Sequence, residues 1–112
     1  MVTRRQPQDR SAQYEDAIYR ELIERLGANA RRLREERDIT QEDAAVLCEM
    51  DVRVLQLVEN RRTNPTFTTL ARLARGFKVD PSSLVAPLST REKMRTARGA
   101  GSITRPRKRR TG

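Results

Sequence analysis

The chain has 112 residues, of which 36% are hydrophobic and 4% aromatic, and its formal net charge is +9. These values favour one domain with a small aliphatic core and polar tails over two domains. The sequence has no His and one Cys, so it lacks the residue for His-based acid–base catalysis, the commonest zinc ligand and any internal disulfide.

The positive charge is concentrated at the C-terminal end. Residues 1–25 contain five Arg and five acids, and residues 26–87 contain ten Lys and Arg against nine acids. Residues 88–112 contain nine Lys and Arg against Glu92 alone. A basic tail beside a nearly neutral domain is typical of nucleic-acid binders. No apolar run approaches the roughly 20 residues that span a bilayer, and no signal peptide is visible, so we expect a cytoplasmic, nucleoid-associated protein without membrane contact.

Residues 1–25 are predicted to form an N-terminal extension that is helical from about residue 11, where Ser11 can cap a helix. The apolar side chains that follow recur at helical spacing: Ala17, Ile18, Leu22 and Leu26. This stripe is interpreted either as ordinary core or as the seam of a dimer. Gly27 interrupts it, so the segment to Asp38 is either one helix bent at Gly27 or two helices that meet there.

Residues 40–59 are predicted to form two short helices joined by a tight turn. Thr40 can cap the first helix and Asp51 the second, with the turn at Glu49 and Met50. Small side chains would line the inner face of the first helix and aliphatic ones that of the second: Ala44, Ala45, Cys48, Val54, Leu55 and Val58. This plan is that of a helix-turn-helix, which places its second helix, here 51–59, in the major groove of DNA.

Residues 60–87 are predicted to complete the domain with a loop and two helices. Pro65 ends the loop, and Thr66 or Thr68 can cap a helix that buries Leu70, Leu73, Ala74 and Phe77. Asp80 followed by Pro81 favours a last short helix over 82–85. Beyond it, a weak helix over 90–98 is possible, and the rest of 88–112 is expected to be a disordered basic tail. Its cations are expected to contact phosphates without sequence preference: Arg105, Arg107, Lys108, Arg109 and Arg110.

Several segments carry a family resemblance, in order and with the expected spacing: LREERDITQED, LVEN, NP and KVDPSSLV. Together they resemble the lambda-repressor-like, Cro/Xre-type helix-turn-helix family over about residues 26–86. The resemblance implies an all-α, five-helix domain over 26–87, commonly a dimer, that binds operator DNA. The predicted fold is therefore this domain with an extra N-terminal helix and a basic disordered C-terminal tail.

The resemblance also implies roles for individual residues. Gln41 lies where the family places a phosphate contact at a helix N-terminus. On the second helix, Val52, Arg53 and Leu57 occupy base-reading positions, and Gln56 shares their face. Three loop residues, Arg61, Arg62 and Asn64, are expected to touch phosphates. Arg34 and Glu59 match a pair that ties the first helix to the recognition helix in some members, and it is expected to be an exposed pair that fixes orientation.

The chain departs from the family pattern in ways that bear on readout. Glu49 replaces the usual Gly at a turn position, where a left-handed backbone costs about 1 kcal/mol. Ala44 replaces a larger apolar residue. Val52 and Leu57 can contact only thymine methyl groups, and alternatively they face a protein partner or close over the core. Readout would then fall to Arg53, unless it pairs with Glu49, and to Gln56.

The sequence therefore predicts a sequence-specific DNA-binding transcriptional regulator of bacterial or phage type, acting on double-stranded DNA as a homodimer. The alternative is a protein-interaction module, such as an antitoxin or regulatory adaptor, that binds a partner through its third helix or N-terminal helix. An enzyme is not expected, because no catalytic residues, metal ligands or cofactor-binding motif can be assigned.

Overall fold

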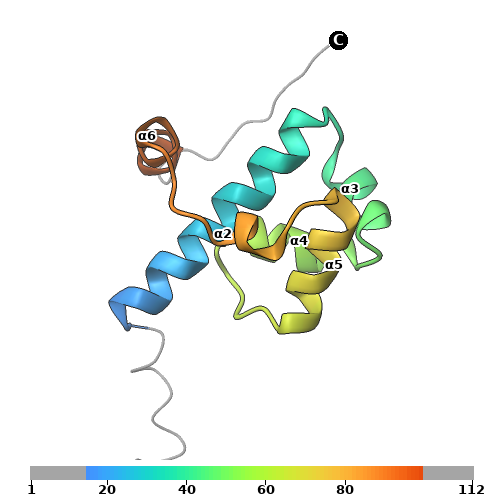
Figure 1. The fold of residues 1–112 in the computed structure, drawn as a ribbon, viewed down its shortest axis with the longest axis horizontal. Helices are drawn as coiled ribbons and strands as arrows, with labels where there is room; N and C mark the ends of the chain where they lie inside the picture. The colour runs from blue at the N-terminus through green and yellow to red at the C-terminus, as the bar shows by residue number, and fades with distance from the viewer. Residues whose placement is uncertain (1–14, 100–112) are drawn as a thin grey trace, which may run out of the picture.

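The computed structural model describes residues 15–99, and within that range all regular secondary structure is helical, with no strand. Five α-helices and one short 3₁₀ helix, η1, follow one another (Figure 1). In chain order they are α2 (Ala17–Glu36), α3 (Gln41–Leu47), α4 (Val52–Glu59), α5 (Phe67–Phe77), η1 (Pro81–Leu84) and α6 (Thr90–Gly99). The all-α fold predicted from the sequence is confirmed.

The first of these helices, α2, is one continuous helix of 20 residues. It begins at Ala17, with Asp16 accepting hydrogen bonds from the backbone N–H groups of Ile18 and Tyr19. The predicted cap at Ser11 lies outside the described residues. Gly27 does not divide the helix. A Cβ at Gly27 would lie 2.8 Å from the carbonyl oxygen of Val58, so this glycine permits close approach of α4.

Helices α3 and α4 form the predicted helix-turn-helix. Thr40 caps α3 by accepting from the N–H of Asp43, and Asp51 caps α4 by accepting from the N–H of Arg53. Glu49 adopts φ 55° in the turn, as its replacement of Gly predicts. Arg72 of α5 donates to the carbonyl oxygen of Glu49, which anchors this left-handed turn against the next helix.

Local signals also define α5 and η1. Thr66, rather than Thr68, caps α5 by accepting from the N–H of Thr69, 3.2 Å away. Lys78 ends α5 with a left-handed φ of 58°. Asp80 then caps η1, where Pro81 occupies a first-turn position. A hydrogen bond from the N–H of Ser82 lowers the pKa of the Asp80 carboxyl below its ordinary value.

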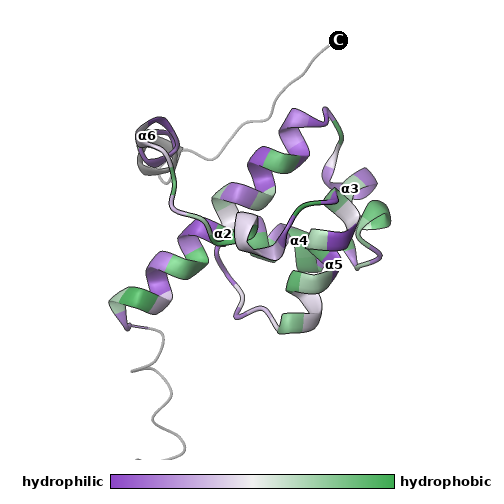
Figure 2. Ribbon diagram, viewed as in Figure 1, coloured by the Kyte–Doolittle hydropathy of each residue, from purple (hydrophilic) through white to green (hydrophobic). Residues whose placement is uncertain are grey.

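The core lies between the C-terminal half of α2, from Leu26 onward, and the helices α3, α4, α5 and η1. Its largest fully buried side chains are Phe77, Leu55, Leu73, Leu84 and Cys48. Burial raises the pKa of the Cys48 thiol, as expected for a small core residue. Apolar colour continues onto the first turns of α2 (Figure 2), which project from this core. Assignment of the whole α2 stripe to the core is wrong, since Leu26 is buried whereas Ile18 is 69% and Leu22 41% exposed.

The segment that follows η1 packs against α2 as it leaves the core. Buried Asn29 donates from Nδ2 to the carbonyl oxygens of Leu84 and Ala86, each 3.1 Å away. Helix α6 follows, which confirms the weak helix predicted over 90–98 within a region otherwise expected to be disordered. Figure 1 shows α6 apart from α3, α4 and α5, and an ion pair between Arg95 and Glu35 joins it to α2.

Candidate nucleic-acid interface

Helix α4 presents one face to the core and the other to solvent. Leu55 and Val58 are buried, and Val54 is only partly buried, less than its predicted inward position implied. On the outer face Arg53 and Leu57 are exposed. Two aliphatic anchors and the Asp51 cap therefore fix the orientation of a short helix that turns Arg53 and Leu57 outward.

The four predicted reading residues share the outer part of α4 but differ in exposure. Val52 and Gln56 are half-buried, whereas Leu57 is 42% exposed, so Leu57 does not close over the core. The Arg53 side chain has no hydrogen-bond or ion-pair partner among residues 15–99. Glu49, the alternative partner predicted for it, instead faces Arg75 at 3.5 Å. The Arg53 guanidinium on the outer face is thus unpaired within the described residues.

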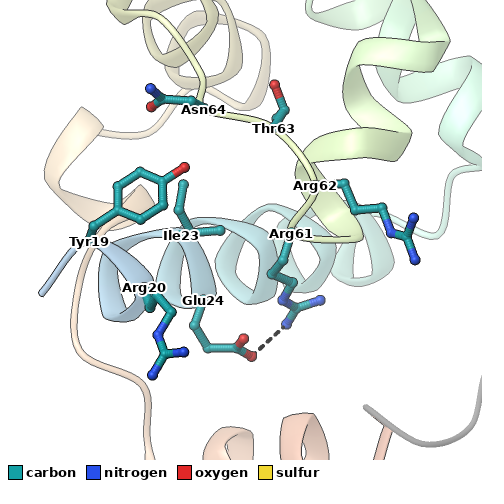
Figure 3. A pocket seen from close by; sticks show the side chains of 8 residues that line it. All are labelled: Tyr19, Arg20, Ile23, Glu24, Arg61, Arg62, Thr63 and Asn64. Carbon is teal, nitrogen blue, oxygen red and sulfur yellow. Dashed lines mark hydrogen bonds and ion pairs between the residues drawn. The ribbon is translucent and has the colours of Figure 1, made fainter. Parts of the chain in front are cut away.

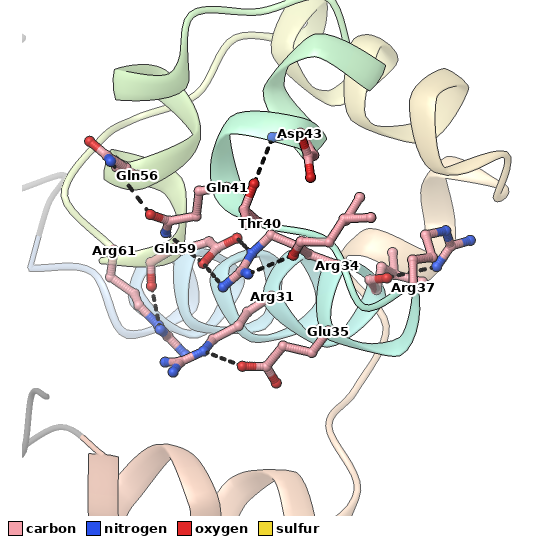
Figure 4. A network of polar contacts seen from close by, with 12 residues as sticks. Arg31, Arg34, Glu35, Arg37, Thr40, Gln41, Asp43, Gln56, Glu59 and Arg61 are labelled. Atoms are coloured by element: carbon pink, nitrogen blue, oxygen red, sulfur yellow. Dashed lines mark hydrogen bonds and ion pairs between the residues drawn. The ribbon is translucent and has the colours of Figure 1, made fainter. Parts of the chain in front are cut away.

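A polar network joins the start of α3 to α4 (Figure 4). The Nε2 of Gln41 donates to Oε1 of Glu59 over 3.0 Å. The Oε1 of Gln41 accepts from Nε2 of Gln56 over 3.5 Å. The first residue of α3 and the outer face of α4 are therefore linked by side-chain amides. Such a chain restricts the rotamers of both glutamines.

At the base of this network, Arg34 of α2 holds Glu59 with two parallel hydrogen bonds. Nε lies 2.8 Å from Oε2 and Nη2 lies 3.1 Å from Oε1. The pairing is as predicted, but its expected exposure is wrong, since the side chains are 15% and 4% exposed. Burial opposes the charge of Arg34, but the hydrogen bond and charge of Glu59 outweigh that effect and raise the pKa of the guanidinium.

The three phosphate contacts predicted in the loop after α4 differ in orientation. Arg62 and Asn64 are exposed, and their side chains have no hydrogen-bond or ion-pair partner within the described part of the chain. Arg61 has φ 57°, and its guanidinium turns toward α2, donating to Glu24 Oε2 over 3.0 Å and to the carbonyl oxygen of Glu59. Local sequence gave no signal for this orientation, because it depends on Gly27 leaving room beneath the Arg61 side chain.

Other expectations concern chemistry outside this surface. Among residues 15–99, no group of three His, Cys, Asp or Glu side chains is placed to hold a metal ion. No described helix is both long enough and apolar enough to cross a membrane. The predicted contacts in the tail, from Arg105 to Arg110, lie outside the described residues.

Comparison with known proteins assigns the family. Residues 25–87 match the family model described as a helix-turn-helix domain. The chain belongs to the helix-turn-helix family of DNA-binding domains. Within this family it is 37% identical over 62 residues to a protein of Sinorhizobium fredii (strain NBRC 101917 / NGR234) named uncharacterized HTH-type transcriptional regulator y4dJ. That match covers 55% of this chain and 80% of the relative.

A solved structure shares the helix-turn-helix fold. It is the crystal structure of the hypothetical transcription factor NHTF from Neisseria, with a TM-score of 0.56 and 22% sequence identity. The alignment covers 85% of this chain and 95% of that one. The first turns of α2, residues 17–24, lie outside the segment that matches the helix-turn-helix family model.

Proposed function

We propose that the chain is a sequence-specific DNA-binding transcriptional regulator of bacterial or phage type, with α4 lying in the major groove. The observation that carries this proposal is the uncommitted Arg53 guanidinium on the outer face of a helix anchored by the buried Arg34–Glu59 pair. A guanidinium can grip O6 and N7 of guanine. The family match and the regulator named among its relatives support the same function.

The other predicted contacts have distinct roles in this proposal. Gln56 reads an adjacent base or supports Gln41, whose remaining amide hydrogen is available to a backbone phosphate at the start of α3. Arg62 and Asn64 contact phosphates beyond the C-terminus of α4, and Arg61 contributes mainly by shaping that loop. Val52 and Leu57 contact thymine methyl groups. In a homodimer the two α4 helices would enter half-sites about 34–36 Å apart on one face of the duplex.

The test is DNA binding by the full chain, after genome-wide mapping of bound fragments has supplied a site. We expect Arg53→Ala to reduce the preference for that site over unrelated DNA by about 1–3 kcal/mol. Arg91→Ala is the matched control, because Arg91 is an exposed cation on α6 with no side-chain partner in the described part of the chain. Equal affinity of the wild type for all sequences, unchanged by Arg53→Ala, would count against specific readout.

A second candidate function is a protein-interaction module that keeps the helix-turn-helix fold. The exposed apolar side chains on α3 and α4 favour it, since Val46 is 79%, Leu47 46% and Leu57 42% exposed. Exposed apolar surface often marks a partner site. Recovery from the native host of a stoichiometric protein that protects α4 from hydrogen exchange would support this function. Recovery of DNA fragments alone would reject it.

A further inference from the structure

A crevice of about 480 Å³ lies between the first turns of α2 and the loop that follows α4 (Figure 3). Tyr19 and Ile23 of α2 form one side, and Thr63 and Asn64 of the loop form the other. The α2 side belongs to the part of the helix that lies outside the family match. The crevice therefore combines a loop expected beside DNA with a helical extension that lies outside the family match.

The crevice carries more positive than negative charge. Arg20, Arg61 and Arg62 line it together with one acid, Glu24. Arg61 is paired with Glu24, so these two charges largely offset one another. The side chains of Arg20 and Arg62 are exposed, and neither has a hydrogen-bond or ion-pair partner within residues 15–99. Arg20 and Arg62 thus line the crevice from two different elements, and neither guanidinium is paired with an anion of the described residues.

The Arg61–Glu24 pair also fixes the shape of this opening. Arg61 has a left-handed backbone and lies across Gly27, where a Cβ would come within 2.9 Å of its Nε. Its guanidinium reaches Glu24 one turn earlier on α2. The loop is therefore attached to α2 beneath the crevice, which sets how the two segments that carry Arg20 and Arg62 lie relative to each other. Guanidinium groups bind phosphate oxygens through charge-assisted hydrogen bonds.

We propose that this crevice is a phosphate-binding site, and that its occupant is a backbone phosphate of the DNA bound by α4. The inference deepens the proposed DNA-binding function and rests on it. Arg62 and Asn64, which would contact the DNA backbone beyond the end of α4, also line the crevice. The next phosphate of the same DNA strand would therefore lie near Arg20. The first turns of α2 thereby extend the contacted backbone beyond the matched helix-turn-helix domain.

The decisive experiment measures binding of the full chain to a labelled duplex over a series of salt concentrations. Each phosphate contact contributes about one unit to the slope of log affinity against log salt. We expect Arg20→Ala to lower that slope by about one unit and to weaken specific and unrelated duplexes by the same factor. Arg91→Ala removes an equal charge from α6 and should change the slope less. Equal slopes for these two variants would overturn the proposal.

A second variant is expected to act in the opposite direction. Glu24→Gln keeps a side-chain oxygen that can accept from Arg61 but removes the one acid that lines the crevice among residues 15–99. We expect tighter DNA binding and an unchanged helical circular dichroism signal. Weaker DNA binding by a variant with that unchanged signal would contradict a phosphate site.

Two further comparisons separate this inference from other outcomes. If Arg53→Ala leaves sequence preference unchanged while Arg20→Ala lowers the salt slope, specific readout fails and the phosphate site stands. If Arg53→Ala alone has its expected effect, the phosphate site fails and the proposed function stands. Adenosine 5′-monophosphate tests a free ligand: binding to the full chain that Arg20→Ala abolishes, with an unchanged salt slope, would assign the crevice to free phosphates and overturn the DNA assignment.

Discussion

Glu59 is a carboxylate with only 4% of its surface exposed, on the helix proposed to read DNA. Its two oxygens accept from Arg34 on α2, and one of them also accepts from Gln41 on α3. A buried ion pair gives little net stability relative to an apolar replacement, because both charges lose hydration. Its value here lies in orientation, since one acid links three helices at the proposed reading surface.

Removing this acid is predicted to destabilise the fold strongly. Glu59→Ala leaves the Arg34 guanidinium buried without its partner, and we expect the free energy of unfolding to fall by about 3–5 kcal/mol. Urea denaturation followed by circular dichroism measures the change. The control is Glu36→Ala, which breaks the more exposed Arg32–Glu36 pair and should cost less than about 1 kcal/mol. Similar losses in both variants would contradict the structural role of Glu59.

Gly76 is predicted to be necessary where α5 crosses the helix-turn-helix. An added Cβ would lie 2.5 Å from Sγ and 2.7 Å from Cα of Cys48, at the C-terminus of α3. In an open helix, Gly→Ala stabilises by up to about 1 kcal/mol. Here we expect Gly76→Ala to destabilise by about 1–3 kcal/mol through overpacking, measured by thermal and urea unfolding. An increase in stability would show that the two helices separate at little cost.

Among the elements, α6 is joined to α2 by an electrostatic contact that depends on pH. Burial raises the pKa of the Glu35 carboxyl, but hydrogen bonds from Arg95 and Arg31 outweigh it and lower that pKa below its ordinary value. The attachment is therefore fully present above the ordinary carboxyl pKa and is lost as the pH falls through the lowered folded value. Since these side chains are exposed, the contribution is about 0–1 kcal/mol.

Acidification is accordingly predicted to release α6 before the core unfolds. Amide chemical shifts and relaxation rates of residues 90–95 should be constant from pH 8 to about pH 5, then move toward those of a free helix at lower pH. Glu35→Gln should show the released values at neutral pH. An α6 that keeps its neutral-pH shifts in Glu35→Gln would indicate that other contacts hold it.

The elements differ in how far the sequence predicts them. Thr40 and Asp51 were predicted as caps because a cap depends on neighbours within three residues. The exposure of Ile18 and Leu22 was not predicted, because periodicity reveals an apolar face but not what covers it. Similarly, the burial of Glu59 and the turn of Arg61 toward Glu24 depend on contacts 25 and 37 residues away in sequence. Placement of the candidate interface on α4 followed from local pattern, whereas its supporting contacts required the fold.

At the scale of the whole molecule, charge is divided between a nearly neutral domain and a basic C-terminal region. The cations at 105–110 are expected to attract any DNA, independently of its sequence. Specificity and general affinity would then reside in separate parts of the chain, with Arg53 contributing to the first and the tail to the second.

Neutralising the tail is predicted to reduce affinity and increase selectivity. Replacing Arg105, Arg107, Lys108, Arg109 and Arg110 with Gln should lower the salt slope for unrelated DNA by up to about five units, because fewer counterions are released. The ratio of specific to unrelated affinity should rise or stay constant. Anisotropy titrations on both duplexes measure these quantities, with a tail of the same composition in scrambled order as the control. A loss confined to the specific duplex would instead assign sequence readout to the tail.

The two hydrogen bonds from Asn29 have a practical consequence for engineering this chain. They fasten the segment leaving η1 to the middle of α2, through the carbonyl oxygens of Leu84 and Ala86. All thirteen buried hydrophobic residues among residues 15–95 lie at or before Leu84, the first of these two carbonyl partners. A fusion junction placed after Pro87 should therefore leave the core intact, so that a fluorescent reporter or a second reading module can replace everything downstream.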